Sequence, residues 1–147
     1  MSSSTIPVYT ECQLQNHAGK NQYVTLDNQN YWHGNRDPPR PIQDQQAGEF
    51  KHNTDSKGSI GGVAYLLKDN KLKWIIAWSN VENEPNKCRS ILIIEGNKAI
   101  DWSQIKVSLG KSRNQSNNNN KFGYLSEAVI DQTSPTPTLK ATLRPAS

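Results

Sequence analysis

Histidine is the side chain of this sequence best suited to acid–base chemistry, and three histidines are present. His17, His33 and His52 belong to no HExxH motif and to no spaced cluster with cysteine, so no metal ligand is predicted. His33 or His52, with a nearby Lys or Arg, could serve a small basic hydrolase of nuclease type. No GxSxG motif, phosphate-binding loop or dinucleotide fingerprint occurs, so neither a catalytic residue nor a cofactor is predicted.

Aromatic residues beside polar segments favour a different chemistry, which is stacking on a sugar ring or contact with a lipid headgroup. Three such candidates are adjacent at positions 31–33, and a fourth follows Asp101. The stretch 105–122 holds four basic residues and no acidic one, so it could bind an anionic group. The alternatives are that the aromatic side chains close one end of the fold and that the basic stretch is a solvated loop. The predicted ligand-binding residues are Tyr31, Trp32, His33, Trp102, Lys111 and Arg113.

The composition excludes several classes of protein. A chain of 147 residues has room for one domain, and no apolar run approaches the ~18 residues that span a bilayer. Hydrophobic residues make up 33% of the chain, mean hydropathy is −0.81, and 16 Asn and 10 Gln replace the missing apolar residues. The formal net charge of +4 is too small for charge-driven disorder. A nucleic-acid partner is possible, but no nucleic-acid-binding motif supports it. The amide content is also compatible with a storage or structural stress protein that has no specific ligand.

The N-terminal residues lack the basic start and the apolar core of a secretory signal, so a cytoplasmic location is predicted. Cys12 and Cys88 form no CxxC pair, and we expect both to be reduced and packed. Charge is uneven along the chain, because residues 1–50 carry a net charge of −2 and residues 51–147 a net charge of +6.

Short extended segments must position these residues. Alternation of polar and apolar residues, or an apolar run between turn residues, predicts strands at Gln22–Leu26, Ile60–Leu67, Lys73–Ser79, Arg89–Glu95, Ile105–Leu109 and Thr138–Arg144. Tyr124–Ile130 fits a strand or a short helix. Turns are expected at 68–71, 82–87 and 95–97, a loop or edge at 37–41, and loops over 1–20 and 111–121. Many short strands without helical periodicity predict an all-β, single-domain antiparallel β-sandwich over residues 1–147.

Two tryptophans indicate where the core of this sandwich lies. Trp74 and Trp78 are four residues apart on one expected strand, so they face the same side, while Ile75 and Ala77 face the other. Both faces are apolar, which predicts a central strand covered on both sides. The glycine-rich run 58–62 precedes a strand and not a helix, so we expect a bulge or a close approach of backbones there.

The order of motifs between residues 31 and 95 resembles the jasmonate-induced protein family of plants. The residues that carry this resemblance are Trp32 with Gly34, Pro41-Ile42, Gly48 and Phe50 with His52, Gly58-Ser59, Gly62-Val63-Ala64-Tyr65, and Trp74 leading into Ala77-Trp78-Ser79-Asn80. The resemblance covers about half of the chain and implies a role in plant stress or defence.

In outline, an all-β chain with a central aromatic strand is also similar to the sandwich of actinoporins and aegerolysins, which presents aromatic and basic groups to lipid headgroups and has fungal relatives that bind sugars. Residues 1–15 contain Pro7 and no apolar stripe of helical period, so the amphipathic helix with which actinoporins form pores is not expected. The leading hypothesis is a non-enzymatic plant defence protein that recognises a carbohydrate or a lipid headgroup through loops at one end of the sandwich.

Overall fold

The computed structural model describes residues 6–67, 72–93, 99–119 and 123–146. Nine strands and one helix account for most of them. The elements are β1 (Tyr9–Asn16), β2 (Val24–His33), β3 (Gln46–Asn53), β4 (Ser59–Leu67), β5 (Lys73–Asn80), β6 (Lys87–Ile93), α1 (Trp102–Gly110), β7 (Gln115–Asn119), β8 (Tyr124–Ile130) and β9 (Thr138–Pro145).

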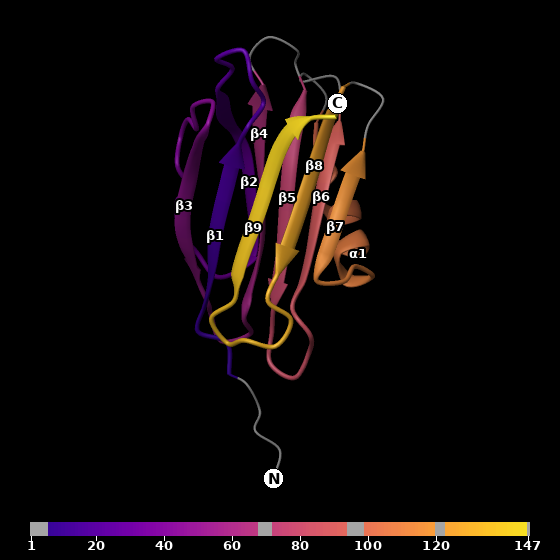
Figure 1. The fold of residues 1–147 in the computed structure, drawn as a ribbon. Helices are drawn as coiled ribbons and strands as arrows, with labels where there is room; N and C mark the ends of the chain where they lie inside the picture. Colours follow the sequence, from indigo (N-terminus) through magenta and orange to yellow (C-terminus); the bar gives the residue numbers. More distant parts are fainter. Residues whose placement is uncertain (1–5, 68–71, 94–98, 120–122, 147) are drawn as a thin grey trace.

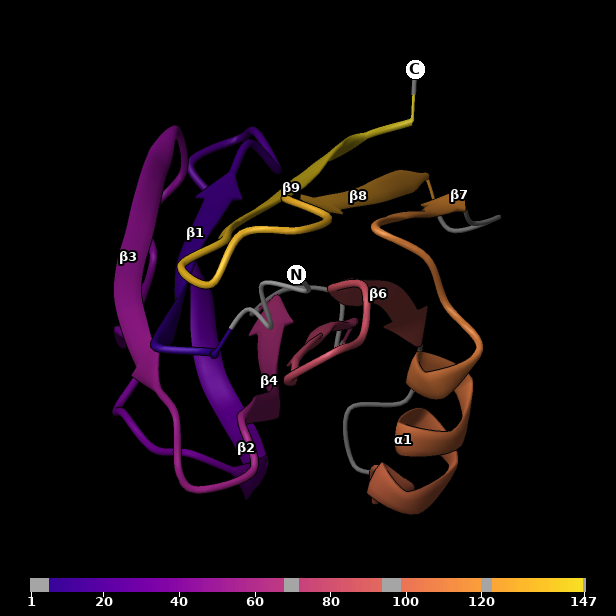
Figure 2. The ribbon, with the colours of Figure 1, turned by 90° about the horizontal axis from the view of Figure 1, so that it is seen from below.

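The strands form two sheets that face each other (Figures 1 and 2). One sheet has the order β3-β1-β9-β8-β7 and the other the order β2-β4-β5-β6. Neighbouring strands are antiparallel except for β1 and β9, which run parallel from the pair Glu11 and Thr138 to the pair Asn16 and Leu143. The prediction of an all-β antiparallel sandwich is therefore confirmed, and the parallel pairing of β1 with β9 is a departure from it.

The core lies between the sheets, and β5 is its central strand on the smaller sheet. Trp74 and Trp78 are fully buried between the layers, as their spacing predicted. Ile75 and Ala77 belong to a second apolar cluster, with Ile105 and Leu109 of α1. Figure 2 shows α1 beside the small sheet, outside the space between the two layers. The expectation of a strand covered on both sides is confirmed.

The segment Ile105–Leu109 is not a strand, because it belongs to α1. Asp101 caps this helix by accepting a hydrogen bond from the Gln104 amide at 3.1 Å. Ile105 and Leu109 are four residues apart, so they share a helix face and are buried against the small sheet, whereas Val107 between them is 52% exposed. The alternation of apolar residues that indicated a strand was therefore fortuitous.

Two segments expected as loops contain strands. Residues 1–20 include β1, in which the buried residues Thr10, Cys12, Leu14 and Asn16 alternate with more exposed ones. Two of these four are polar, so the alternation of apolar residues was hidden. Residues 111–121 include β7, whose polar side chains reach β6. The strand β3 was not predicted for the same reason as β1. Its buried residues are Gly48, Phe50 and His52, so they show no run of alternating apolar side chains.

The remaining expectations fit with small changes. The short segment Gln22–Leu26 overlaps the start of the longer β2, Tyr124–Ile130 is a strand, and residues 81–86 connect β5 to β6. The expected turns at 68–71 and 95–97 lie outside the described residues. Both cysteines are buried and free. Within the described part of the chain, no helix is long and apolar enough to cross a membrane.

Candidate functional site

The six predicted ligand-binding residues do not come together in one place. Tyr31 faces the core, where its ring centroid lies 4.4 Å from that of His52 and 6.3 Å from that of Trp78. Trp32, the next residue, points to the opposite face of the sheet and packs against Trp102 with ring centroids 6.1 Å apart. Because successive side chains of a strand point to opposite faces, Tyr31 packs against the core between the sheets and Trp32 packs against the cluster beneath α1.

Trp32 and Trp102 pack against the apolar residues beneath α1. Lys106 places its Nζ 5.9 Å from the centroid of the Trp32 ring, and a Cβ added at Gly62 would lie 2.6 Å from the Trp102 ring. Gly62 thus lets the indole of Trp102 approach β4 closely. The close approach of backbones expected at the glycine-rich run occurs at Gly58, where an added Cβ would lie 2.5 Å from the Asn80 carbonyl oxygen. Both indoles are half-buried, and the Trp102 N–H is buried with no hydrogen-bond partner among the described residues.

The two histidines of the hydrolase alternative have different surroundings. His33 contacts Asp55, with Nδ1 and Oδ2 2.9 Å apart, near the surface. His52 has no exposed surface, and its Nδ1 lies 2.6 Å from the Ser59 hydroxyl and 3.3 Å from the Trp78 indole nitrogen. An enclosed imidazole cannot exchange a proton with a bound substrate, so this geometry gives no support to the form of the hydrolase alternative that uses His52. Among the described residues, no three potential metal ligands gather at one point.

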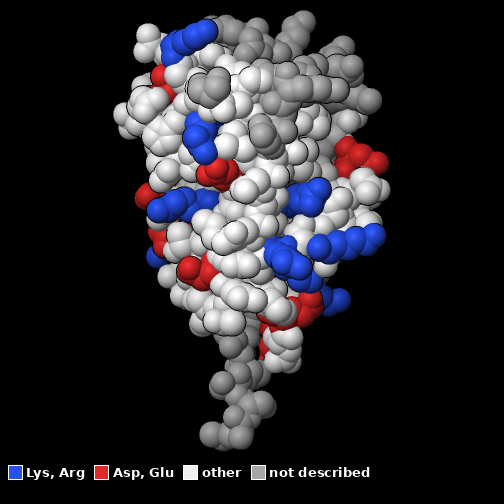
Figure 3. Space-filling model, turned by 45° about the vertical axis from the view of Figure 1, so that its right-hand side comes forward, with Lys and Arg blue, Asp and Glu red and all other residues white. Residues whose placement is uncertain are grey.

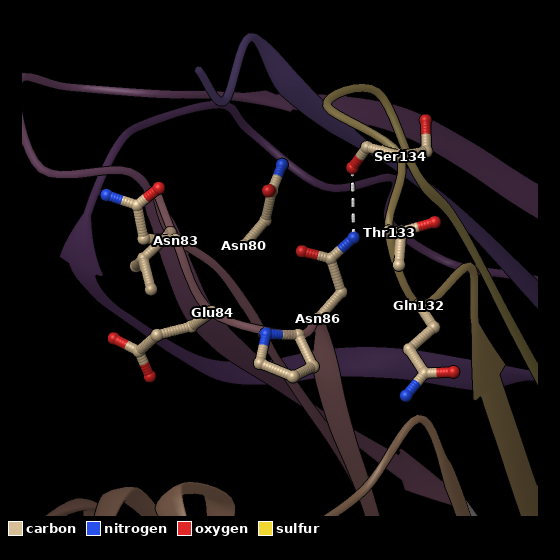
Figure 4. Close-up of a pocket in the computed structure, with 9 residues that line it drawn as sticks. Asn80, Asn83, Glu84, Asn86, Gln132, Thr133 and Ser134 are labelled. Carbon is tan, nitrogen blue, oxygen red and sulfur yellow. Dashed lines mark hydrogen bonds between the residues drawn. The ribbon is translucent and has the colours of Figure 1, made fainter. Parts of the chain in front are cut away.

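A polar hollow of about 280 Å³ lies where the β5–β6 and β8–β9 connections meet, at one end of the sandwich (Figure 4). Its wall is formed by Asn80, Val81 and residues 83–86 from the first connection and by residues 132–134 from the second. Four of these residues carry side-chain amides, two carry hydroxyls and one is a carboxylate. We call this the amide hollow.

Asn80 and Asn86 form the fixed part of the amide hollow. Both are nearly fully buried. The Asn80 amide nitrogen donates to the carbonyl oxygens of Tyr9 at 3.2 Å and Pro135 at 3.5 Å, and that of Asn86 donates to Asp131 at 2.8 Å and Ser134 at 3.0 Å. Within the described part of the chain, no hydrogen bond reaches either side-chain carbonyl oxygen. These bonds fix two acceptors at the hollow, and Figure 4 shows the oxygen of Asn86 turned towards Asn80.

Local sequence explains why the two connections hold this shape. Asn83 has φ 65°, a left-handed conformation that asparagine tolerates better than most residues. The Asn86 amide N–H donates to the Gln132 carbonyl oxygen at 2.9 Å, which ties the first connection to the second. In the second, the Ser134 hydroxyl accepts from the Thr136 amide at 3.0 Å. The wall is therefore held by backbone bonds and by the side chains of Asn80, Asn86 and Ser134, which also line the hollow.

A second lobe of about 390 Å³ adjoins the amide hollow and shares Pro85, Asn86 and Gln132 with it. Lys87 and residues 112–114 complete this adjoining lobe, so Arg113 is the one predicted residue that lies at this end-loop site. Lys111 caps the C-terminus of α1 and lines neither space. Figure 3 shows Lys and Arg side chains gathered on the lower right of this side of the molecule.

Sequence reasoning missed the residues of the amide hollow. Asn80 and Asn86 are two of 16 asparagines, and their partners Tyr9, Asp131 and Ser134 lie between 45 and 71 positions away. The pairing of the strands, which brings these positions together, is not visible in the local pattern. The one usable signal was the cluster of turn residues at 82–87.

A hollow near Tyr23 and Asp44 offers less to a ligand. Oδ1 of Asp44 accepts from the Gly19 amide at 2.9 Å and from the Gln45 side chain at 3.0 Å, and Oδ2 accepts from the Asn21 amide at 3.2 Å. Its carboxylate is thus already used to hold the β1–β2 connection.

No family model matches this chain, and no curated protein matches its sequence. Among solved structures, the chain is similar in fold to the wild-type lectin XCL of the fungus Xerocomus chrysenteron, with a TM-score of 0.59 and 13% identity over 92% of this chain and 98% of the lectin. A mutated form of that lectin matches with the same TM-score of 0.59 and 11% identity, over 94% of this chain and 98% of the other. At these identities the likeness is one of fold, and it agrees with the two-layered sandwich described above.

Proposed function

We propose that this protein binds carbohydrate in the amide hollow and catalyses no reaction on it. The observation that carries the proposal is the pair of buried asparagines, Asn80 and Asn86. Backbone carbonyl oxygens hold their amide nitrogens, and no described residue donates to their own carbonyl oxygens. Sugar hydroxyls are donors that can meet such fixed acceptors without a cost of ordering the protein. The exposed side chains of Asn83, Glu84 and Gln132 at the rim supply further hydrogen-bonding groups.

The shared fold with a fungal lectin supports a carbohydrate ligand, although fold alone does not fix function. The described residues that line the hollow include no aromatic ring, so we expect hydrogen bonds to supply most of the affinity. Neutral hydrogen bonds contribute about 0.5–1.5 kcal/mol each, and three to five of them correspond to a dissociation constant of roughly 1 mM. We therefore expect weak single-site binding that becomes measurable when the glycan is displayed in many copies.

A role in plant stress or defence and a cytoplasmic location remain proposals that rest on the resemblance and on the sequence. A lipid headgroup is the other ligand class proposed from the sequence. Liposomes tested beside the immobilised glycans would detect binding to such a headgroup.

The test is binding of the protein to a panel of immobilised glycans, followed by titration of the best ligand. Thr133→Trp places an indole at the hollow from an exposed position, and we expect it to reduce binding at least tenfold. Gln132→Ala removes one rim amide, which should weaken binding by two- to tenfold. Thr25→Trp, at an exposed position of β2 outside the hollow, is the matched control and should bind like the wild type.

Trp32→Ala separates this site from the aromatic stacking site suggested by the sequence. Since Trp32 does not line the amide hollow, we expect this variant to keep its affinity while it remains folded. Unchanged binding by a folded Thr133→Trp protein, or absence of glycan binding by the wild type at high density of display, would refute the proposal.

A further inference from the structure

The adjoining lobe differs from the amide hollow in its charge. Its lining includes two charged side chains, Lys87 and Arg113, and both are positive. Lys87 is already engaged, because its Nζ donates to the Gly110 carbonyl oxygen at 3.1 Å and lies 3.5 Å from the Glu84 carboxylate. Among the described residues, no carboxylate pairs with Arg113. The free charge of this lobe is therefore a guanidinium.

The backbone that carries Arg113 is anchored on both sides. The Arg113 carbonyl oxygen accepts from the Cys88 amide of β6 at 2.9 Å, and the neighbouring Asn114 carbonyl oxygen accepts from the Ile130 amide of β8 at 2.9 Å. The segment thus bridges the two sheets, and its Cα atoms are fixed although the Arg113 side chain is exposed. A guanidinium on a fixed backbone can select an anionic group by position as well as by charge.

The nearby acidic side chains have other partners. Glu84, on the rim of the amide hollow, faces Lys87, and Oδ2 of Asp131 accepts from the Thr138 amide at 3.0 Å. An anion beside Arg113 would therefore meet no unpaired carboxylate of the lobe. Asn86 and Gln132 belong to both spaces, so one ligand can reach the asparagine acceptors and the guanidinium together.

We propose that the preferred ligand is an acidic saccharide, whose hydroxyls bind in the amide hollow and whose carboxylate or sulfate binds Arg113 in the adjoining lobe. This inference rests on the proposed function and adds the class of the sugar. A planar guanidinium forms two parallel hydrogen bonds with a carboxylate, which a neutral sugar cannot reproduce. Because Arg113 is exposed, the preference should be modest, about five- to tenfold at low ionic strength, and should shrink as salt is added.

The experiment compares matched neutral and acidic sugars displayed on one polymer, namely galactose with galacturonic acid and glucose with glucuronic acid, together with a sulfated galactose. The wild type should bind at least one acidic member five- to tenfold more tightly than its neutral partner. Arg113→Gln should reduce this ratio to about one, because binding of the acidic sugar falls to the level of the neutral one. Arg113→Lys keeps the charge without the planar fork and should retain only part of the preference for the carboxylate.

Arg40→Gln is the control of equal charge change, since Arg40 is exposed on the β2–β3 connection and lines neither space. It should keep the full preference. Equal binding of neutral and acidic partners by the wild type, or a preference that survives Arg113→Gln, would overturn the inference and leave carbohydrate binding intact. Equally strong competition by inorganic phosphate, polyglutamate or RNA, which lack the acidic sugar, would also overturn it.

Discussion

A single buried imidazole, that of His52, joins four strands of both sheets. The Ser59 hydroxyl of β4 accepts from Thr10 of β1 at 2.9 Å and lies 2.6 Å from Nδ1 of His52 on β3. The Trp78 indole N–H of β5 reaches the same two atoms at 3.2 and 3.3 Å. On the other side of the ring, Nε2 of His52 is buried with no partner among the described residues. These surroundings suit a neutral imidazole and disfavour a charged one.

Burial lowers the pKa of His52 from 6.5 to about 4, against the opposing effect of the Asp55 carboxylate. Between about pH 6.5 and pH 4, His52 is therefore protonated in the unfolded chain but neutral in the folded protein. Stability contributed by the neutral ring is complete above pH 6.5 and is lost as the pH falls from about 6.5 to about 4. At pH 4.5 the loss amounts to about 2–3 kcal/mol.

His52→Gln should remove this loss, because glutamine does not titrate. Urea unfolding at pH 7 and pH 4.5 measures the effect as the difference between the two proteins in the pH dependence of their unfolding free energy.

The neighbouring carboxylate of Asp55 affects stability in a different pH range. Hydrogen bonds from the Lys57 and Gly58 amides and from His33 lower the pKa of Asp55 to about 2, the Lys57 bond most strongly. Stability due to Asp55 is lost as the pH falls below about 4, so the two windows are separate. An identical pH dependence for wild type and variant would contradict the prediction.

At the scale of the elements, β7 closes one side of the sandwich through its side chains. The Leu92 amide of β6 donates to Oδ1 of Asn118 at 3.0 Å, and the Ser90 amide donates to the Ser116 hydroxyl at 3.0 Å. Two edge donors of the small sheet are thereby satisfied by the edge strand of the large sheet. This explains why a run of polar residues, expected as a mobile loop, is a strand.

The alternation along β7 provides a matched pair of substitutions. Asn118→Ala leaves the Leu92 amide, which belongs to a nearly buried residue, without its acceptor. We expect a loss of about 1–3 kcal/mol in the free energy of unfolding and faster hydrogen exchange at that amide. Asn117→Ala, on the exposed face of the same strand, should change stability by less than about 0.5 kcal/mol. Equal effects of the two substitutions would show that the contact between β6 and β7 does not depend on Asn118.

For the whole molecule, the sequence predicted the layers better than their connections. The apolar runs of β4 and β5 and the alternation of β9 identified strands because burial of one or both faces leaves a direct pattern. The alternation of buried and exposed residues in β1 was not visible in the sequence, because two of its buried residues, Thr10 and Asn16, are polar. Their side chains form hydrogen bonds across the fold. The amide hollow could not be predicted, since Asn80 and Asn86 acquire their roles only when two distant connections meet. Arg113, which lines the adjoining lobe, was a candidate from the sequence because its basic segment was unusual in composition.

The predicted single domain has a direct thermodynamic consequence, because the two sheets share their largest buried side chains. The Trp74 indole N–H of the small sheet donates to the Ser126 hydroxyl of the large sheet at 2.8 Å, and Trp78 packs against Phe50 with ring centroids 5.9 Å apart. Separation of the sheets would expose both tryptophans and leave the Ser126 hydroxyl and the Trp74 N–H without their mutual bond. Neither sheet should therefore unfold alone. We expect tryptophan fluorescence and far-ultraviolet circular dichroism to report one transition with the same urea midpoint and slope. In the Asn118→Ala variant both midpoints should move together, whereas a fluorescence change that precedes the loss of strand signal would mean that the sheets come apart first and that the chain holds two cooperative units.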